Sequence, residues 1–375
     1  MRIAMIGQKR TGSREGGIEV VVTELAVRMA ALGHEVTCYD RSGTDVNGVP
    51  APTEPYEYNG VRIVPVKTVD VKGLAALTSA YAATRAALGD RPDVIHYHAE
   101  GPCNALPLAA RAGVRTVATI HGLDWQRAKW GGIASRVIRR GERNAARMAD
   151  ELIVLSKSVQ GYFQDEYGRE AHLIPNGVNV AERVPADRIT ERWGLTEGSY
   201  VLYLGRIVPE KRPELLLEAF RGLDTDKRLV IAGGSSDTTG FYGEVRSLAA
   251  RDPRVIMVGF VEGSVLEELY SNAYCYVLPS DLEGMPMSLL EAMAHGCCCV
   301  TSDIPECAEV IANAGITFRS GDVGDLYNAL RLLLGDHAGA ARLGDLARAC
   351  IGSECDWDSV VRKTLSLYAR DLTNR

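Results

Sequence analysis

Residues 275–293, CYVLPSDLEGMPMSLLEAM, decide the fold class of this chain. An apolar run that starts at Cys275 ends at Leu278, a loop containing Gly284 follows, and a helical pattern begins near Pro286. Proline favours the first position of a helix, because the N–H that it lacks would have no partner there. A buried strand that passes through a short loop into a helix is the repeating unit of a doubly wound parallel sheet.

The same alternation extends over almost the whole chain. A first series of β-branched, apolar runs predicts strands over 3–6, 35–39, 61–66, 94–98, 116–121 and 151–155. A second series predicts strands over 200–204, 228–232, 255–258, 275–278 and 299–301. Helical patterns lie between them, including one over 18–32, whereas 42–60 is expected to be a loop. Strands that alternate with helices predict parallel sheets with helices on both faces.

The chain has 375 residues, which favours two domains of similar size. The turn residues at 174–177 separate the two series of strands. We therefore expect a first domain over 1–175, a second over 176–356, and a C-terminal helix over 357–375 that is free to pack back on the first. Ligands of such sheets bind beyond the carboxyl ends of the strands, so a cleft between the domains is the expected site.

Composition narrows the class of protein. A hydrophobic content of 46% is typical of a globular chain, and a net charge of -6 argues against a general nucleic-acid binder. Nine cysteines, with Cys297, Cys298 and Cys299 consecutive, match neither zinc spacing nor a disulfide framework, which favours a reducing cytosol. We see no signal peptide and no membrane-spanning apolar run, and expect a soluble cytoplasmic protein, with peripheral contact at the inner membrane face as an open alternative.

The loop and helix after Leu278 suit a phosphate-bearing ligand. The first N–H groups of a helix lack partners, and with the helix dipole they attract an anion such as a pyrophosphate. Glu283 and Glu291 bracket this position. A carboxylate can accept hydrogen bonds from two vicinal hydroxyls, so each acid suits a ribose or a hexose. Glu291 alone would favour an ordinary strand-loop-helix with solvated acids, but the two acids at this spacing favour a binding site.

A second cluster follows the strand at 200–204. The stretch 204–213, LGRIVPEKRP, places Arg206 at the strand end and Lys211 across a short turn. Two fixed cations there can neutralise the charge that builds on a departing diphosphate. Surface Arg and Lys near turns are common, so this pair is uninformative by itself.

Two loops of the first half carry further candidates. Gly16 and Gly17 lie between the first strand and the first helix, where glycines allow the backbone to approach a phosphate or a sugar, or simply form a tight turn. His121 ends the strand at 116–121 and precedes Asp124 and Trp125. Trp125 could stack on a sugar ring or pack in the core, and Asp124 could cap a helix.

Two possible metal motifs are set aside. His96 and His98 fall on one face of a strand but have no third ligand at useful spacing, so packed or acceptor-facing histidines are the better interpretation. Asp224 and Asp226 form an Asp-x-Asp in a turn and are expected to be solvated. We expect no metal site.

The segment 127–147 is strongly basic. It carries Arg127, Lys129, Arg136, Arg139, Arg140, Arg143 and Arg147 against a single acid, Glu142. The pattern fits a solvated helix face, or a basic face that docks on anionic lipid.

In this order and over nearly the whole chain, these motifs resemble the family-four retaining glycosyltransferases, which have the GT-B fold of two facing Rossmann-like domains. The family's Glu-x7-Glu signature is matched by Glu283 and Glu291, and its Gly-Arg-x4-Lys pattern by 205–211. The segment 124–127 is similar to a subset of bacterial cell-surface polysaccharide transferases. Similar chains usually carry a proline where Thr11 to Ser13 stand here, which leaves the path of the glycine loop less defined.

The resemblance implies roles for individual residues. Glu291 would hold the nucleotide ribose, Glu283 would contact the donor sugar, and Arg206 and Lys211 would bind the diphosphate in place of a metal. His121 would lie near the donor sugar. The implied donor-binding set is Gly16, Gly17, Gly284, Met285, Pro286, Ser288, Leu289 and Glu291, and the acceptor-side set is His98, Asp124, Trp125 and Arg127.

The function implied is retaining transfer of a sugar from a nucleotide-sugar donor, with a UDP-sugar favoured. The acceptor would be a saccharide or a lipid-linked saccharide in the synthesis of cell-surface polysaccharide or glycoconjugate, with no cofactor and no nucleic-acid partner. A GDP-mannose or dTDP-sugar donor, a GT-B sugar-nucleotide 2-epimerase and a sugar-binding protein stay open as alternatives. The pair Arg206 and Lys211 and the lack of a signal peptide count against the binding protein.

Overall fold

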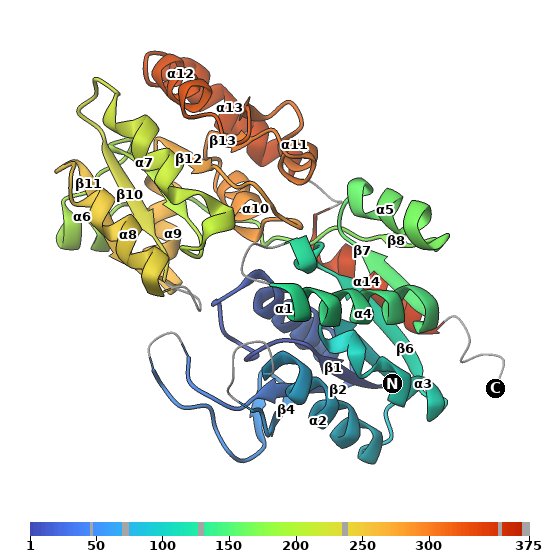
Figure 1. The fold of residues 1–375 in the computed structure, drawn as a ribbon. Helices are drawn as coiled ribbons and strands as arrows, with labels where there is room; N and C mark the ends of the chain where they lie inside the picture. Colours follow the sequence, from blue (N-terminus) through green and yellow to red (C-terminus); the bar gives the residue numbers. More distant parts are fainter. Residues whose placement is uncertain (46–47, 70–74, 127–130, 235–238, 352–354, 370–375) are drawn as a thin grey trace. The chain divides into compact units, whose positions relative to one another are not determined.

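The computed structural model describes residues 1–375 except 46–47, 70–74, 127–130, 235–238, 352–354 and 370–375. The chain forms two compact units, each built on one sheet (Figure 1). The first unit is Met1–Gly177 together with the C-terminal helix that starts at Trp357, and the second is Val178–Asp356.

The first unit contains an eight-stranded sheet in the order β3-β4-β2-β1-β5-β6-β7-β8. Its strands are β1 Arg2–Ile6, β2 Glu35–Arg41, β3 Tyr56–Tyr58, β4 Val61–Val66, β5 Val94–His98, β6 Arg115–Ile120, β7 Glu151–Val154 and β8 His172–Leu173. Its helices are α1 Gly17–Ala31, α2 Ala75–Gly89, α3 Leu106–Arg111, α4 Gly132–Met148, α5 Lys157–Tyr167 and α14 Trp357–Ala369, with short 3-10 turns η1 Pro102–Asn104 and η2 Asp124–Gln126. Every neighbouring pair is parallel except β3 and β4.

The antiparallel strand β3 lies inside the segment 42–60, which was expected to be a loop, so that expectation is wrong in part. Tyr58 pairs with Val61 across Asn59 and Gly60. Both turn residues have positive φ, 48° and 79°, which is the geometry of a two-residue type I′ hairpin turn. The Asn-Gly dipeptide is the sequence signal for this hairpin.

Helix α14 completes the first unit, although it is separated from it in sequence by the whole second unit. The guanidinium of Arg115 donates to the backbone oxygen of Leu367 through Nε and Nη2, at 3.1 and 2.8 Å. The hydroxyl of Tyr368 lies 2.6 Å from Nδ1 of His96 on the central strand β5. The guanidinium of Arg28, on α1, lies 5.8 Å from the ring centroid of Trp357.

The second unit contains a six-stranded sheet in the order β11-β10-β9-β12-β13-β14, and all its pairs are parallel. Its strands are β9 Tyr200–Leu204, β10 Arg228–Ala232, β11 Val255–Gly259, β12 Cys275–Leu278, β13 Cys299–Ser302 and β14 Gly315–Phe318. Its helices are α6 Arg188–Trp193, α7 Pro213–Arg221, α8 Thr239–Ala249, α9 Gly263–Asn272, α10 Met287–Ala294, α11 Pro305–Ile311, α12 Val323–Leu334 and α13 His337–Cys350, with the 3-10 turn η3 Pro209–Lys211. Two doubly wound, Rossmann-like sheets are therefore confirmed.

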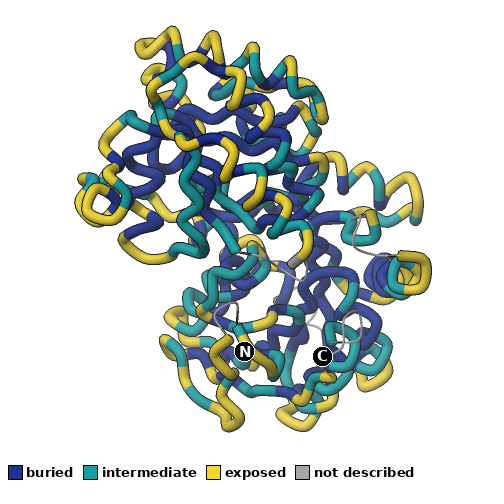
Figure 2. Tube along the Cα trace, turned by 60° about the vertical axis from the view of Figure 1, so that its left-hand side comes forward, coloured by how far each residue is buried: buried dark blue, intermediate teal, exposed yellow. Residues whose placement is uncertain are grey.

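Buried residues fill the interior of each unit (Figure 2), and strands β5, β6, β12 and β13 are buried along their whole length. All nine cysteines lie among the described residues and none of them is in a disulfide; seven are buried. Burial raises the pKa of Cys298 to about 12, so this thiol stays protonated and behaves as a small apolar side chain. Among the helices within the described ranges, none is long and apolar enough to cross a bilayer.

Candidate functional site

Several of the predicted residues lie near the point where the strand order of each sheet reverses. In the first unit this switch point lies between β1 and β5, and in the second between β9 and β12. Connections leave the two central strands toward opposite faces of the sheet at such a point, which opens a crevice at the carboxyl ends. Gly7 and His98 mark the first of these strand ends, and Arg206 and Ser280 mark the second.

At the first switch point the backbone of His98 lies against Gly7. Gly7 has a φ of +139°, and a Cβ at this position would lie 2.3 Å from the carbonyl oxygen of His98, so only glycine fits. His98 is fully buried, and its Nδ1 lies 3.1 Å from Nε2 of His121, which follows β6. Its Nε2 has no hydrogen-bond partner among the described residues. Burial holds the pKa of His98 well below its usual range, so His98 is a neutral partner of His121.

His96 packs beneath His98 and has a structural role. The two ring centroids are 4.1 Å apart. His96 bonds to the hydroxyl of Tyr368 through Nδ1 and to Oγ1 of Thr119, at 2.7 Å, through Nε2. Burial lowers the pKa of His96 to about 3. Across the described part of the chain, no three His, Cys, Asp or Glu side chains are grouped so that they could hold a metal ion.

The glycine loop before α1 is held by a buried acid that sequence reasoning missed. Asp40, at the end of β2, accepts hydrogen bonds from Nε2 of Gln8 at 3.0 Å and from the N–H and Oγ1 of Thr11 at 2.7 and 2.8 Å. The sequence does place this acid directly after the apolar run of β2, and that position could have identified it. These three bonds fix the loop that leaves β1.

Gly16 caps α1 in an extended conformation, and no side chain caps this helix, which starts at Gly17. The carboxylate of Glu19 lies beside the glycine pair: its Oε1 accepts from the N–H of Lys9 at 2.9 Å, and a Cβ on Gly16 would lie 2.5 Å from its Oε2. The glycine pair was expected to face a phosphate or a sugar. In the structure the carboxylate of Glu19 lies beside Gly16, which the glycine pattern did not predict.

Asp124 and Trp125 lie in the turn η2. The N–H of Asp124 donates to Oε1 of the fully buried Glu100 at 2.9 Å. Helix α4 has Gly131 at its N-cap position, so Asp124 is not the cap of that helix. The Trp125 ring is half-buried, and the guanidinium of Arg139 lies over it, 4.4 Å from its centroid. Arg127 and Lys129 lie outside the described residues.

At the second switch point the backbone that leaves β9 is tightly fixed. The hydroxyl of Tyr203 donates to the carbonyl oxygen of Arg206 at 2.9 Å. Gly233 has a φ of +148°, and a Cβ there would lie 1.9 Å from the carbonyl oxygen of Gly205. The side chain of Arg206 itself is half-buried at the strand end. Gly233 thus supports this backbone, although it belongs to none of the sequence motifs.

Lys211 and Glu283, which were predicted as separate ligands, form one ion pair. Nζ of Lys211 lies 2.6 Å from Oε1 of Glu283, and the two side chains are only 11% and 9% exposed. The hydroxyl of Ser280 donates to the same oxygen at 2.6 Å. The loop after β12 is therefore bound to the turn after β9 through the two side chains on which the chemistry was expected to depend.

Helix α10 begins at Met287 with Pro286 at its N-cap position, and no side chain caps it. The N–H groups of Met287 and Ser288 belong to the first turn and have no acceptor within the helix. The side chain of Leu289 is fully buried, so only its backbone faces this turn. Gly284 is buried and Met285 half-buried in the preceding loop.

Two tyrosines orient the polar side chains of α10. The hydroxyl of Tyr276, on β12, donates to Oγ of Ser288 at 2.8 Å. The hydroxyl of Tyr270, on α9, donates to Oε2 of Glu291 at 3.1 Å. Neither tyrosine belongs to a motif. The only sign of their role in the sequence is that each carries a hydroxyl group at a buried position.

The comparisons with known proteins agree with this geometry. Residues 15–182 match the model of Glycosyltransferase Family 4, and residues 186–349 match that of Glycosyl transferases group 1. Glycogen synthase of Mycobacterium tuberculosis is 31% identical over 401 residues, covering 98% of this chain and 94% of the relative. The fold, the site and these matches define the chain as a GT-B glycosyltransferase with a nucleotide-sugar donor. The chain belongs to glycosyltransferase family 4.

Solved structures share the fold. Sucrose-phosphate synthase from Thermosynechococcus elongatus superposes with a TM-score of 0.85 at 22% identity, covering 100% of both chains. The Anabaena protein HepE, solved in complex with UDP-glucose, has a TM-score of 0.78 at 17% identity and covers 98% of this chain and 99% of its own.

Proposed function

We propose that this enzyme transfers a sugar from a UDP-sugar with retention of configuration and without a metal ion. The acceptor is a saccharide or a lipid-linked saccharide, and the product is a cell-surface polysaccharide or glycoconjugate. The observation that carries the proposal is the switch point of the second unit. There the Lys211–Glu283 ion pair, Arg206 and the N-terminus of α10 lie on two adjacent strand ends.

The diphosphate of the donor fits the cations and the helix N-terminus. Arg206 and Lys211 supply positive charge, and the first-turn N–H groups of Met287 and Ser288 supply donors aligned with the helix dipole. Glu291, oriented by Tyr270, accepts hydrogen bonds from the ribose hydroxyls. Side-chain cations then take the charge-neutralising role that a metal ion has in other phosphate chemistry.

Glu283 contacts the sugar and is coupled to the leaving group through Lys211. When the bond between C1 and the phosphate oxygen breaks, the bonding electron pair moves to the diphosphate, and Lys211 and Arg206 stabilise that charge. The acceptor oxygen bonds to C1 on the same face, and its proton passes to the released phosphate oxygen. His121, held by the neutral His98, hydrogen-bonds a sugar hydroxyl.

The choice of UDP is supported by HepE, which has this fold and was solved with UDP-glucose. The choice of acceptor has a second candidate. Glycogen synthase is the name of a relative 31% identical to this chain, and that name favours a glucan acceptor over a cell-surface saccharide.

The test begins with a thermal-shift screen of UDP-, GDP-, dTDP- and ADP-sugars, because a ligand that binds only the native state raises Tm. The donor found is then incubated with glucan and with short saccharide acceptors in excess EDTA, and the anomeric configuration of the product is determined by NMR. We expect a UDP-sugar, an α-linked product from an α-linked donor, and full activity in EDTA. Inversion, or a loss of activity that manganese restores, contradicts the proposal. Epimerised nucleotide sugar formed without transfer would indicate the 2-epimerase instead.

A further inference from the structure

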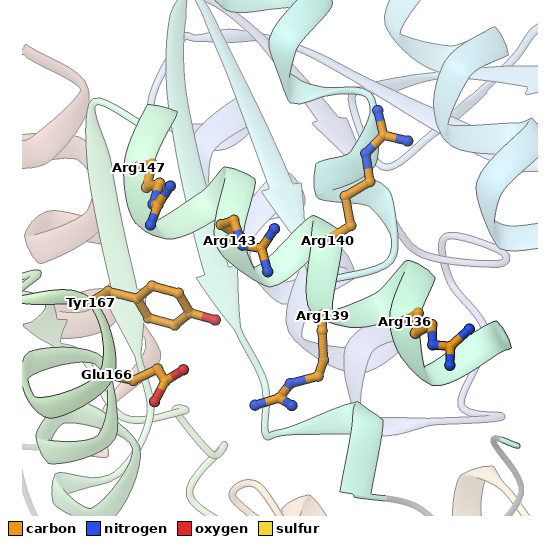
Figure 3. Close-up of a pocket in the computed structure, with 7 residues that line it drawn as sticks. All are labelled: Arg136, Arg139, Arg140, Arg143, Arg147, Glu166 and Tyr167. Atoms are coloured by element: carbon orange, nitrogen blue, oxygen red, sulfur yellow. The ribbon is translucent and has the colours of Figure 1, made fainter. Parts of the chain in front are cut away.

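Helix α4 presents a row of cations on the surface of the first unit. Five exposed arginines line a shallow pocket of about 630 Å³ together with Glu166 and Tyr167 (Figure 3). We call these five residues the arginine stripe: Arg136, Arg139, Arg140, Arg143 and Arg147. Within the residues that the structure describes, none of them forms an ion pair with a carboxylate.

The stripe is confined to one side of the helix. At about 100° per residue, its five positions fall within an arc of about 100°. The buried positions Ile138, Gly141, Glu142 and Ala145 lie on the opposite side and pack on the unit. Glu142, the one acid of the helix, is fully buried and accepts hydrogen bonds from the hydroxyls of Tyr162 and Tyr167, at 2.9 and 2.5 Å. The carboxylate of α4 therefore faces inward, and the arginines face the solvent.

The arginines are arranged for an extended anionic surface and not for one compact anion. Figure 3 shows the side chains of Arg139 and Arg140, at the two edges of this face, diverging from each other, so the guanidinium groups are spread apart. From Arg136 to Arg147 the helix rises about 16 Å, a length that spans several phosphate groups. A single phosphate could engage only a part of this row.

Apolar side chains at the two ends of α4 identify the kind of surface. Ile133 is 78% exposed in the first turn, and Met148 is 37% exposed at the last residue. A hydrated polyanion offers nothing to these side chains. A bilayer combines anionic headgroups with an apolar interior just below them, which matches a cationic row flanked by exposed apolar residues.

We propose that the arginine stripe docks the first unit on an anionic lipid bilayer. This goes beyond the transfer reaction and stands on the charge and exposure of α4, whether or not the donor is a UDP-sugar. If the acceptor is lipid-linked, docking would bring the enzyme to the surface in which that acceptor is anchored.

The test compares two fourfold variants of the full chain that change net charge equally. The stripe variant replaces Arg136, Arg140, Arg143 and Arg147 by Gln, and it keeps Arg139 because that side chain covers Trp125. The control variant replaces Arg85, Arg111, Arg362 and Lys363, exposed basic residues elsewhere on the first unit, by Gln. Each protein is sedimented with vesicles of phosphatidylglycerol and phosphatidylcholine, and with phosphatidylcholine alone, at low salt.

We expect the wild type and the control variant to sediment only with the anionic vesicles and to be released by about 1 M salt, where the screening length falls to about 3 Å. Each arginine near the surface strengthens binding roughly fivefold, so the stripe variant should lose binding by more than a hundredfold. It should keep wild-type Tm and UDP binding, which separates a failure of this proposal from a failure of the proposed function.

The proposal is overturned if the wild type does not sediment with anionic vesicles at low salt, or if the stripe variant sediments as well as the control. Retention of the wild type on immobilised polyphosphate, without vesicle binding, would assign the stripe to a chain polyanion and also overturn it.

Discussion

Breaking the Lys211–Glu283 pair should cost the second unit more stability than breaking any exposed pair. At 2.6 Å and an effective dielectric constant of about 20, the Coulomb attraction is about 6 kcal/mol. Desolvation of two side chains that are about nine-tenths buried offsets much of this. Removing one partner leaves the other charge buried without its counter-ion, which costs about 3 kcal/mol. We therefore expect Glu283→Gln and Lys211→Met each to destabilise the protein by about that amount.

The double variant tests whether the two costs have one origin. If they do, Lys211→Met combined with Glu283→Gln should be no less stable than either single variant, giving a coupling energy of about 3 kcal/mol. At about 2–4 °C per kcal/mol for a unit of this size, calorimetry should record a fall in Tm of about 6–12 °C for each variant.

The matched control is the pair Arg212–Asp281, which joins the same two loops. Its N–O distance is also 2.6 Å, but its side chains are 32% and 37% exposed. Asp281→Asn should cost less than about 1 kcal/mol, because water screens an exposed pair. Additive losses in the Lys211–Glu283 cycle, or equal losses in the two pairs, would refute the reasoning.

Three further predictions concern single groups. Arg206→Ala should lower kcat roughly a hundredfold and leave Tm unchanged, and near-normal turnover would remove its diphosphate role. Glu291→Gln should weaken UDP binding in calorimetry, whereas Glu283→Gln should impair transfer more than UDP binding; equal weakening in both variants would contradict this division. Because burial lowers the pKa of His96 to about 3, the unfolded chain binds a proton between pH 6.5 and 3 that the native state does not. The free energy of unfolding should therefore decrease as the pH is lowered, and at pH 5 it should be about 2 kcal/mol below its value at neutral pH. His96→Gln should flatten this pH dependence, measured by urea unfolding. An unchanged slope would assign the effect to other groups.

The regular part of the fold was predictable because parallel strands buried on both faces are continuous apolar runs. The strands β9, β10 and β12 occupy the predicted residues. The two-residue strand β8 has too few residues to show a pattern. The hairpin of β3 and β4 was missed because the Asn59-Gly60 turn was taken as part of a long loop, although its chemistry specifies a reversal of the chain.

The sequence predicted which residues belong to the site but not which of them contact one another. Motifs identified Lys211 and Glu283, but their ion pair joins residues 72 apart in sequence and depends on β9 and β12 being neighbours. The same holds for His98 and His121, which meet because β5 and β6 are adjacent in the sheet. Sequence spacing along one strand or helix carries no information about which loop ends lie side by side.

The packing of α14 on the first unit also determines the order in which the two units can be completed during biosynthesis. His96 receives its Tyr368 partner, and Arg115 its Leu367 acceptor, from a segment made after the entire second unit, Val178–Asp356. At about 5–20 residues per second, a ribosome needs about 10–35 s to make that intervening chain. During this interval the second unit has all its residues while the first still lacks a helix, so the nascent first sheet exposes the surface that α14 will cover. The half of the enzyme that is synthesised first is thus the half that is completed last.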